Sequence, residues 1–181
     1  ISEYNKTKMV SERVLLSYQD DMKVQIIRPA TVCGVSPRMR LDVAVNLLTM
    51  QALVKGKITV FGGNQARPNI HMDDITDVYL HFMDRPEHTG VFNAGFENIT
   101  ILDIAKLITK YIPAEVIVTA SSDPRSYRIN SDKLLATGFK PKKTVEHAVQ
   151  EIIESYRSGA LKDEDHFYNL KWMQKTGIVE K

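Results

Sequence analysis

The residues nearest the N-terminus of this chain could perform acid–base chemistry. Tyr4 and Lys8 stand four positions apart, directly before a segment, residues 9–18, whose apolar side chains recur at helical spacing. In a helix the two side chains would lie one turn apart on the same face, with the ammonium group close to the phenol. A fixed neighbouring cation favours the phenolate, so such a pair could exchange a proton near neutral pH. The same spacing also occurs in helices where a solvated lysine merely lies beside a half-buried tyrosine.

The elements that would position this pair belong to a globular sequence of 181 residues, of which 43% are apolar. The net charge of +2 arises without a basic run, so the composition gives no footprint for nucleic acid or an anionic membrane. Cys33 is the only cysteine, and no Cys/His cluster has zinc-ligand spacing, so we expect neither an internal disulfide nor a structural metal. No apolar run approaches the ~20 residues of a membrane span, and no signal segment opens the chain, so a cytoplasmic protein is expected.

Short strands alternate with helices in the pattern of hydrophobic residues. Periodicity and capping residues predict helices over residues 9–18, 42–55, 73–84, 100–111 and 144–158. Apolar runs predict strands over residues 23–27, 58–61, 91–94 and 115–119. This alternation predicts an α/β architecture with at least some parallel pairing. Residues 29–37 are expected to form a loop at the carboxyl end of a strand, which is either a ligand-binding loop or an ordinary connection.

Three further polar positions could contact a ligand. Arg67 lies at a strand-like edge, and its guanidinium could bind a phosphate through two hydrogen bonds or simply pair with nearby acids. Arg125 lies in a polar loop with a second arginine and a tyrosine, which could clamp an anion or remain solvated. Asn46 is a lone polar residue on an apolar helix, where a hydrogen-bonded core group is more common than a ligand contact.

The order of short segments along the chain resembles a known family. Tyr4 to Lys8 is followed by Arg-Pro-Ala-Thr-Val-Cys-Gly at residues 28–34, as in the extended short-chain dehydrogenases. Within that group the resemblance is to the nucleotide-sugar epimerases and dehydratases related to UDP-galactose 4-epimerase. Matching segments follow in order at residues 45–48, 58–62, 65–67, 70–74, 92–95 and 131–141. The similarity extends to about residue 158, and it rests on this ordered succession more than on any single motif.

The resemblance implies a reaction and a cofactor. Tyr4 would be the catalytic acid/base and Lys8 its partner, which also contacts the nicotinamide ribose, and the loop after Pro29 would line the nicotinamide. NAD is the expected cofactor, with NADP as the alternative. Tyr4 would take a proton from a sugar hydroxyl while a hydride passes to NAD⁺, leaving a transient keto-sugar. The fate of that keto-sugar distinguishes epimerisation, dehydration and reduction.

The resemblance also implies a nucleotide-sugar substrate. The residues expected to bind it are Thr31, Asn46, Leu47, Val60, Phe61, Arg67 and Arg125. Asn46 and Leu47 match the helix start that touches the diphosphate in the family. Val60 and Phe61 match the strand beside the nucleotide base, and Arg67 matches the arginine that neutralises the phosphates.

The sequence departs from the family pattern at several points. Thr31 stands where relatives often carry a substrate-binding asparagine. Relatives often have an arginine just before the aspartate equivalent to Asp123, and we expect Arg125 to replace it. The Gly-rich dinucleotide loop and the catalytic Ser/Thr that normally precede the tyrosine are not in these residues. We therefore expect a C-terminal part of the enzyme that alone neither binds NAD tightly nor turns over.

The layout of the family implies how the chain is organised. Residues 1–34 and 68–96 would complete a Rossmann-like, doubly wound parallel sheet, and residues 35–67 and 97–158 would form a small interleaved α/β lobe that binds the nucleotide sugar. Residues 159–181 would be a C-terminal tail that either docks a short helix or packs loosely. Relatives form homodimers by packing the Tyr-Lys helix into a four-helix bundle, so a dimer is expected. A noncatalytic sugar-nucleotide-binding module and a reductase of a non-nucleotide carbonyl compound are the alternatives.

Overall fold

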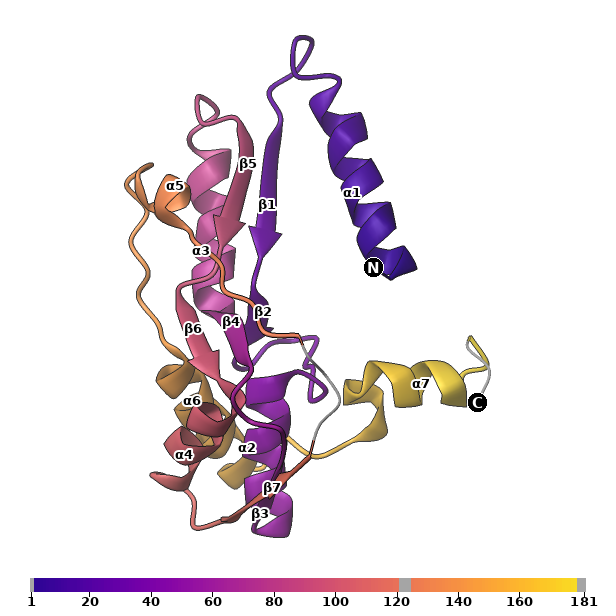
Figure 1. The fold of residues 1–181 in the computed structure, drawn as a ribbon, viewed down its shortest axis with the longest axis vertical. Helices are drawn as coiled ribbons and strands as arrows, with labels where there is room; N and C mark the ends of the chain where they lie inside the picture. Colours follow the sequence, from indigo (N-terminus) through magenta and orange to yellow (C-terminus); the bar gives the residue numbers. More distant parts are fainter. Residues whose placement is uncertain (1, 121–124, 179–181) are drawn as a thin grey trace.

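Helices and strands alternate along the chain in the computed structural model, which describes residues 2–120 and 125–178 (Figure 1). The strands are β1 (Gln25–Pro29), β2 (Thr31–Cys33), β3 (Lys57–Phe61), β4 (Ala66–His71), β5 (Gly90–Ala94), β6 (Glu97–Thr100) and β7 (Glu115–Thr119). The helices are α1 (Glu3–Leu16), α2 (Ala44–Lys55), α3 (Met72–Met83), α4 (Ile101–Thr109), α5 (Asp132–Leu135), α6 (Val145–Arg157) and α7 (Asn169–Lys175), and η1 (Asp165–Phe167) is a 3-10 turn. The predicted α/β class is confirmed.

Side-chain caps begin four of the helices. The Ser2 hydroxyl caps α1, the His71 imidazole caps α3, and the Thr100 and Thr144 hydroxyls cap α4 and α6. Each cap accepts a hydrogen bond from a backbone N–H in the first turn, which would otherwise lack a partner. Gly56 ends α2 with φ +61°, a left-handed conformation that glycine adopts without strain. The predicted helix starts at Thr100 and Thr144 and the stop at Gly56 are confirmed.

The strands form three small sheets. β1 pairs parallel with β5, and β3 pairs parallel with β7. β4 lies between β2, which is parallel to it, and β6, which is antiparallel to it. β1 leads directly into β2 through Ala30, whose N–H donates to the carbonyl of Ala94 at 2.7 Å. The chain from β1 to β2 therefore runs from one sheet into the next without a turn (Figure 1).

The expected loop over residues 29–37 is wrong in its first half. Pro29 closes β1, and residues 31–33 are β2, whose register pairs Val32 with Ile70. The proline ends the apolar run in the sequence, but it lacks only an N–H donor and is tolerated where a strand begins or ends. The partner strand β4 lies almost forty residues away, so the local pattern does not reveal the pairing.

Buried apolar side chains form separate clusters in the two ends of the molecule. One cluster lies among α2, α4 and α6 and includes Val45, Ile104 and Val149, all fully buried. A second lies between α3 and the β1–β5 pair and includes Val78 and Phe92. Figure 1 shows the first group of elements at the lower end of the molecule and the second at the upper end.

The helix α1 packs unlike the others. None of its described residues is buried, although several are apolar. Met9, Val10, Val14 and Leu15 are each about half exposed, at 47–54%. Figure 1 shows α1 beside β1, joined to it by the turn between them and covered by no other labelled element. Apolar helical residues contribute to stability mainly when they are packed, so this face has the character of a contact surface.

Candidate functional site

Tyr4 and Lys8 occupy the first two turns of α1. Ser2 caps this helix by accepting a hydrogen bond from the N–H of Asn5 at 3.3 Å. The Lys8 Nζ lies 5.6 Å from the centroid of the Tyr4 ring, which is within the range of a cation–π contact. Tyr4 is 69% exposed. The pair is thus preorganised by helical spacing alone and is open to a ligand.

The amino end of α1 lies toward the carboxyl end of β1. α1 runs antiparallel to β1, so its first turn lies beside the end of the strand that carries Pro29 (Figure 1). Pro29 is exposed and Thr31 is half-buried. β1 and β5 are parallel, with Pro29 opposite Ala94, so both carboxyl ends lie at the same edge. Ligands of open α/β sheets bind at such edges.

Arg67 and Arg125 meet at the start of β4. A guanidinium nitrogen of Arg67 donates to the carbonyl of Arg125, and the Arg67 guanidinium lies 5.5 Å from the Tyr127 ring centroid. Two more bonds hold the segments together: the Ala66 N–H donates to the Ser126 hydroxyl at 3.1 Å, and the Tyr127 N–H donates to the Ala66 carbonyl at 3.3 Å. The structure therefore brings together two of the predicted anion-binding residues. Asp123 lies outside the described residues.

Val60 and Phe61, at the end of β3, differ in how far their side chains are exposed to a ligand. Val60 is fully buried in the core of α2, α4 and α6, so only its backbone could face a ligand. Phe61 is 60% exposed, and its register partner is Thr119 of β7. The exposed ring could stack on a planar group.

Asn46 fixes the α2 loop, which we define as residues 34–43 between β2 and α2. Its side chain is 2% exposed. The Oδ1 accepts from the Gly34 N–H at 3.1 Å, while the Nδ2 donates to the carbonyls of Gly34 at 3.3 Å and Arg40 at 2.8 Å. Leu47 follows on α2 and is half-buried. Asn46 thus has the role of a hydrogen-bonded core group, and a direct contact between its side chain and a ligand stays a prediction.

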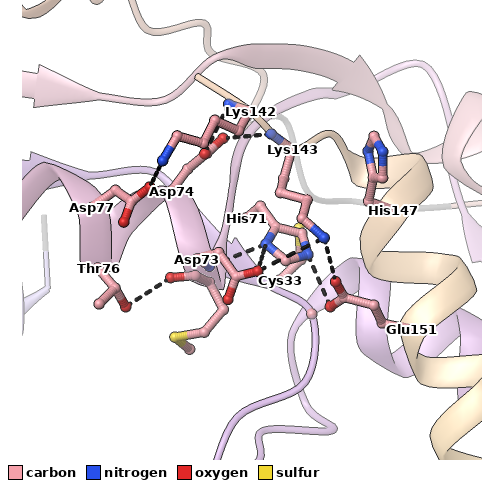
Figure 2. A network of polar contacts seen from close by, with 12 residues as sticks. Cys33, His71, Asp73, Asp74, Thr76, Asp77, Lys142, Lys143, His147 and Glu151 are labelled. Carbon is pink, nitrogen blue, oxygen red and sulfur yellow. Dashed lines mark hydrogen bonds and ion pairs between the residues drawn. The ribbon is translucent and has the colours of Figure 1, made fainter. Parts of the chain in front are cut away.

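The sequence did not reveal a polar network around His71, which Figure 2 shows. The His71 Nδ1 accepts from the Asp73 N–H at 3.1 Å, so the ring proton belongs on Nε2, which donates to a Glu151 oxygen at 3.0 Å. The Lys143 ammonium lies 3.1 Å from the other Glu151 oxygen and 3.9 Å from Asp73. The network joins β4 and α3 to α6.

The side chains of His71, Asp73 and Glu151 lie close enough together to hold a metal ion. Two features favour an ion-pair network instead. Both ring nitrogens of His71 already have partners, and the Lys143 ammonium already places a positive charge beside the two carboxylates. A metal would have to displace that ammonium and a backbone hydrogen bond.

Asp74 also connects α3 to the segment just before α6. It is fully buried, and its two oxygens accept from the N–H groups of Lys142 at 2.9 Å and Lys143 at 3.1 Å. Asp77, one turn further along α3, pairs with the Lys142 ammonium at 2.7 Å nearer the surface. In the sequence the adjacent acids of α3 indicated only a helix start, because their partners are about seventy residues away.

Cys33 is an inert thiol at the end of β2. It is fully buried and not bonded to another cysteine. Burial, reinforced by the nearby Glu97 and Glu151 carboxylates, raises the pKa of the Cys33 thiol to about 12. Cys33 therefore behaves as a small buried hydrophobic residue.

Three solved structures that share this fold contain a nicotinamide cofactor or a nucleotide sugar. The dTDP-glucose 4,6-dehydratase of Bacillus anthracis, in complex with NAD, is 21% identical with a TM-score of 0.75 over 94% of this chain and 55% of that one. The UDP-glucose 4-epimerase of Thermotoga maritima, with UDP-glucose, is 23% identical with a TM-score of 0.76 over 89% and 55%. RMD of Pseudomonas aeruginosa, complexed with NADPH, is 19% identical with a TM-score of 0.73 over 86% and 56%. The fold is therefore that of a Rossmann-like α/β protein.

The sequence places the chain within that class. The model of the NAD dependent epimerase/dehydratase family matches residues 1–95, which is more than half of the 181 residues. The chain belongs to this family, as the resemblance of its motifs predicted. Among curated relatives, an uncharacterized UDP-glucose epimerase of Bacillus subtilis, YtcB, is 30% identical over 60% of this chain and 35% of its own length. Anthocyanidin reductase of Vitis vinifera is 19% identical over 87% of this chain and 50% of its own length.

The chain spans about half the length of the curated relatives and solved structures that it matches. Within residues 2–120 and 125–178, every helix is too short or too polar to cross a bilayer.

Proposed function

We propose that this chain forms part of an NAD-dependent enzyme that epimerises or dehydrates a nucleotide sugar through a transient keto-sugar. The observation that carries the proposal is the Tyr4–Lys8 pair, with the ammonium 5.6 Å from the phenol ring at the open end of α1, in a member of the epimerase/dehydratase family. Tyr4 removes the proton of a sugar hydroxyl, and Lys8 stabilises the negative charge on the phenol oxygen.

The residues of this chain fit one wall of a nicotinamide site. Exposed Tyr4, Lys8 and Pro29 lie toward the carboxyl edge of β1 and β5, where an open sheet accepts a ligand. The 181 residues contain no Gly-x-Gly-x-x-Gly sequence, so the pyrophosphate cradle is not supplied from here. When bound, the cofactor accepts the hydride of the sugar. NAD is our proposal because two solved relatives hold it, while one holds NADPH.

In this proposal the nucleotide sugar binds at the same carboxyl edge of the sheet, on the side of the substrate-binding lobe. Arg67 and Arg125, which meet at the start of β4, provide positive charge for the diphosphate. The exposed Phe61 ring stacks on the base beside the backbone of Val60. Thr31 begins β2, two residues after Pro29, and we propose that its side chain faces the sugar. Solved relatives that contain UDP-glucose or UDP-glucuronic acid support this substrate class.

Asn46 and Leu47 bring the amino end of α2 to the diphosphate. The backbone N–H groups of a helix start favour an anion, and the Asn46 side chain keeps the preceding loop in place through its three hydrogen bonds. Asn46 therefore acts on the substrate by positioning the loop, with any direct contact coming from the backbone.

We extend the proposal to the organisation of the protein. Residues 1–34 and 68–96 belong to the cofactor-binding domain, residues 35–67 and 97–158 to the substrate lobe, and residues 159–181 form the tail. The half-exposed apolar face of α1 supports a homodimer through this helix. We also propose a cytoplasmic location and, for residues 1–181 alone, neither tight NAD binding nor turnover.

Calorimetry of the full-length protein tests the function. UDP-glucose, dTDP-glucose and a GDP-sugar are titrated with and without NAD, and turnover is followed by analysing the sugar products. We expect one nucleotide sugar to bind and to be converted only when NAD is present. Binding that ignores NAD, with no conversion, would instead establish a noncatalytic sugar-nucleotide module.

A reductase of a non-nucleotide carbonyl compound is the second candidate, favoured by the similarity to anthocyanidin reductase over 87% of this chain. The two candidates differ in what Arg67 does. If a diphosphate is bound, Arg67→Ala should lower substrate affinity about 10- to 100-fold, because it removes a charge-assisted hydrogen-bond donor. Unchanged affinity for the converted substrate in Arg67→Ala would favour the reductase.

A further inference from the structure

The C-terminal tail is attached to the α2 loop by three hydrogen bonds. The Leu41 N–H donates to the Phe167 carbonyl at 2.9 Å, and the Asn169 N–H donates to Asp42 Oδ2 at 3.0 Å. The Arg38 guanidinium donates to Asn169 Oδ1 at 3.1 Å. The α2 loop contains no helix or strand of its own, and η1 and the start of α7 bind several of its residues.

Apolar packing accompanies these bonds. A buried cluster consists of Met39 and Leu41 from the α2 loop, Met50 from α2, Ile152 from α6 and Leu161 from the tail. Phe167 and Tyr168 of the tail pack against it. Each of the five buried side chains is at most 5% exposed, so the tail closes a compact core around the loop. Each predicted alternative for the tail holds for one part of it: Phe167 and Tyr168 dock, whereas the short helix α7 that follows buries none of its residues.

A continuous path of polar contacts leads from the tail to Asn46. Asp42 uses its Oδ2 for the Asn169 N–H, and its Oδ1 accepts from Arg40 Nε at 2.5 Å. The Arg40 carbonyl accepts from the Asn46 Nδ2 at 2.8 Å, and Asn46 Oδ1 accepts from the Gly34 N–H. The α2 loop is therefore held between the tail on its outer side and Asn46 on its inner side.

We infer that the tail is a positioning element of the nucleotide-sugar site, acting through Asp42 on the α2 loop and the amino end of α2. This inference rests on the proposed function, in which that helix start contacts the diphosphate. The tail lies beyond residues 1–95, the part of the chain that the family model matches. Substrate binding and tail docking stabilise the same loop conformation, so each favours the other.

Two Asp→Ala variants of the full-length protein test the inference. Asp42→Ala removes both the acceptor for the tail and the partner of Arg40. Asp165→Ala is the matched control, because it removes only an exposed ion pair with Lys175 inside the tail, with 3.7 Å between the charged atoms. For Asp42→Ala we expect the KM of the nucleotide sugar to rise about fivefold, as the loss of a charge-assisted hydrogen bond predicts. The kcat should change less than about twofold, because the loop contributes equally to binding of the substrate and of the transition state. The control should match the wild type in both constants.

Limited trypsin digestion supplies a second readout that a merely structural tail would not change. Lys162 and Lys171 are exposed cleavage sites in the tail, and their peptides are followed by mass spectrometry. Saturating nucleotide sugar should slow their cleavage about threefold or more in the wild type, because ligand binding stabilises the docked state. The protection should disappear in Asp42→Ala and persist in the control.

The outcomes separate this inference from the proposed function. A wild-type protein that turns over a nucleotide sugar, with equal KM in Asp42→Ala and no substrate protection of the tail, would overturn the positioning role and leave the proposed function standing. A protein that neither binds nor converts any nucleotide sugar would overturn both. If Asp42→Ala fails to fold, Arg38→Ala, which removes one bond to Asn169 and one to the Met39 carbonyl, is used in the same two assays and should raise KM by a smaller factor.

Discussion

Arg28 in β1 forms a bidentate ion pair with Glu12 in α1. Arg28 Nε lies 2.9 Å from one carboxylate oxygen of Glu12 and 3.1 Å from the other, and an Nη2 contact completes the pair. This contact ties the middle of α1 to the carboxyl half of β1. Because α1 has no buried residues among those described, the pair sets the angle at which Tyr4 is presented at the edge of the sheet.

Removing this ion pair should have a small, pH-dependent effect on stability. The hydrogen bond from Arg28 holds the pKa of Glu12 below its usual range. A lowered folded-state pKa stabilises the fold above the unfolded pKa of ~4.3, and the stabilisation is lost as the pH falls through the folded value. Arg28 is 53% exposed, so we expect Glu12→Gln to cost only about 0.5 kcal/mol at pH 7. Urea unfolding of the full-length wild type and of Glu12→Gln is measured at pH 7 and at pH 3. The difference between their free energies of unfolding should be present at pH 7 and disappear at pH 3. A difference that grows in acid would contradict this account.

Asp74 and Asp77 should differ sharply in their contribution to stability. Asp74→Ala removes a fully buried carboxylate and leaves the N–H groups of Lys142 and Lys143 without their acceptors, which should cost about 2–4 kcal/mol. Asp77→Ala, in the same helix, breaks one ion pair near the surface and should have a much smaller effect. Urea denaturation of both variants measures the two free energies of unfolding. Equal values would show that the buried joint between α3 and the start of α6 is not what stabilises the fold.

The Cys33 thiol should resist alkylation in the folded protein. Burial and the nearby Glu97 and Glu151 carboxylates raise its pKa to about 12, so the reactive thiolate is scarce at pH 8.5 and reagent access is blocked. We expect the peptide that contains Cys33 to remain unmodified by iodoacetamide for hours in buffer and to react within minutes in 8 M urea. Mass spectrometry of that peptide makes the comparison, and rapid labelling in buffer would rule out the buried position.

Much of the fold follows from local signals in the sequence. The caps at Thr100 and Thr144, the stop at Gly56 and the apolar run of β7 are each determined by neighbouring residues. The sequence predicts neither β2 nor β6, which are short and depend on β4 for their pairing, and it indicates β4 only as a strand-like edge around Arg67. α5 (Asp132–Leu135) was missed because a single turn has no periodicity.

The candidate site was predictable where helical spacing decides it, as for Tyr4 and Lys8. The meeting of Arg67 and Arg125 depended on the resemblance to a family, because 58 positions separate them in the chain. The networks of His71 and Asp42 depend on long-range contacts between residues with ordinary local roles. No sequence pattern shows that a buried imidazole, which caps its own helix, also donates to a carboxylate 80 positions away.

The role of Tyr4 is the central claim, and Tyr4→Phe in the full-length protein tests it most directly. Removing the hydroxyl eliminates the proton acceptor while leaving the ring and the contacts of Arg67 in place. Tyr18→Phe, an exposed tyrosine just beyond α1, is the matched control. With NAD and the nucleotide sugar that the wild type converts, we expect Tyr4→Phe to lower kcat at least ~100-fold, to keep the Kd of the nucleotide sugar within about threefold, and the control to keep full activity. Undiminished turnover in Tyr4→Phe would contradict the account.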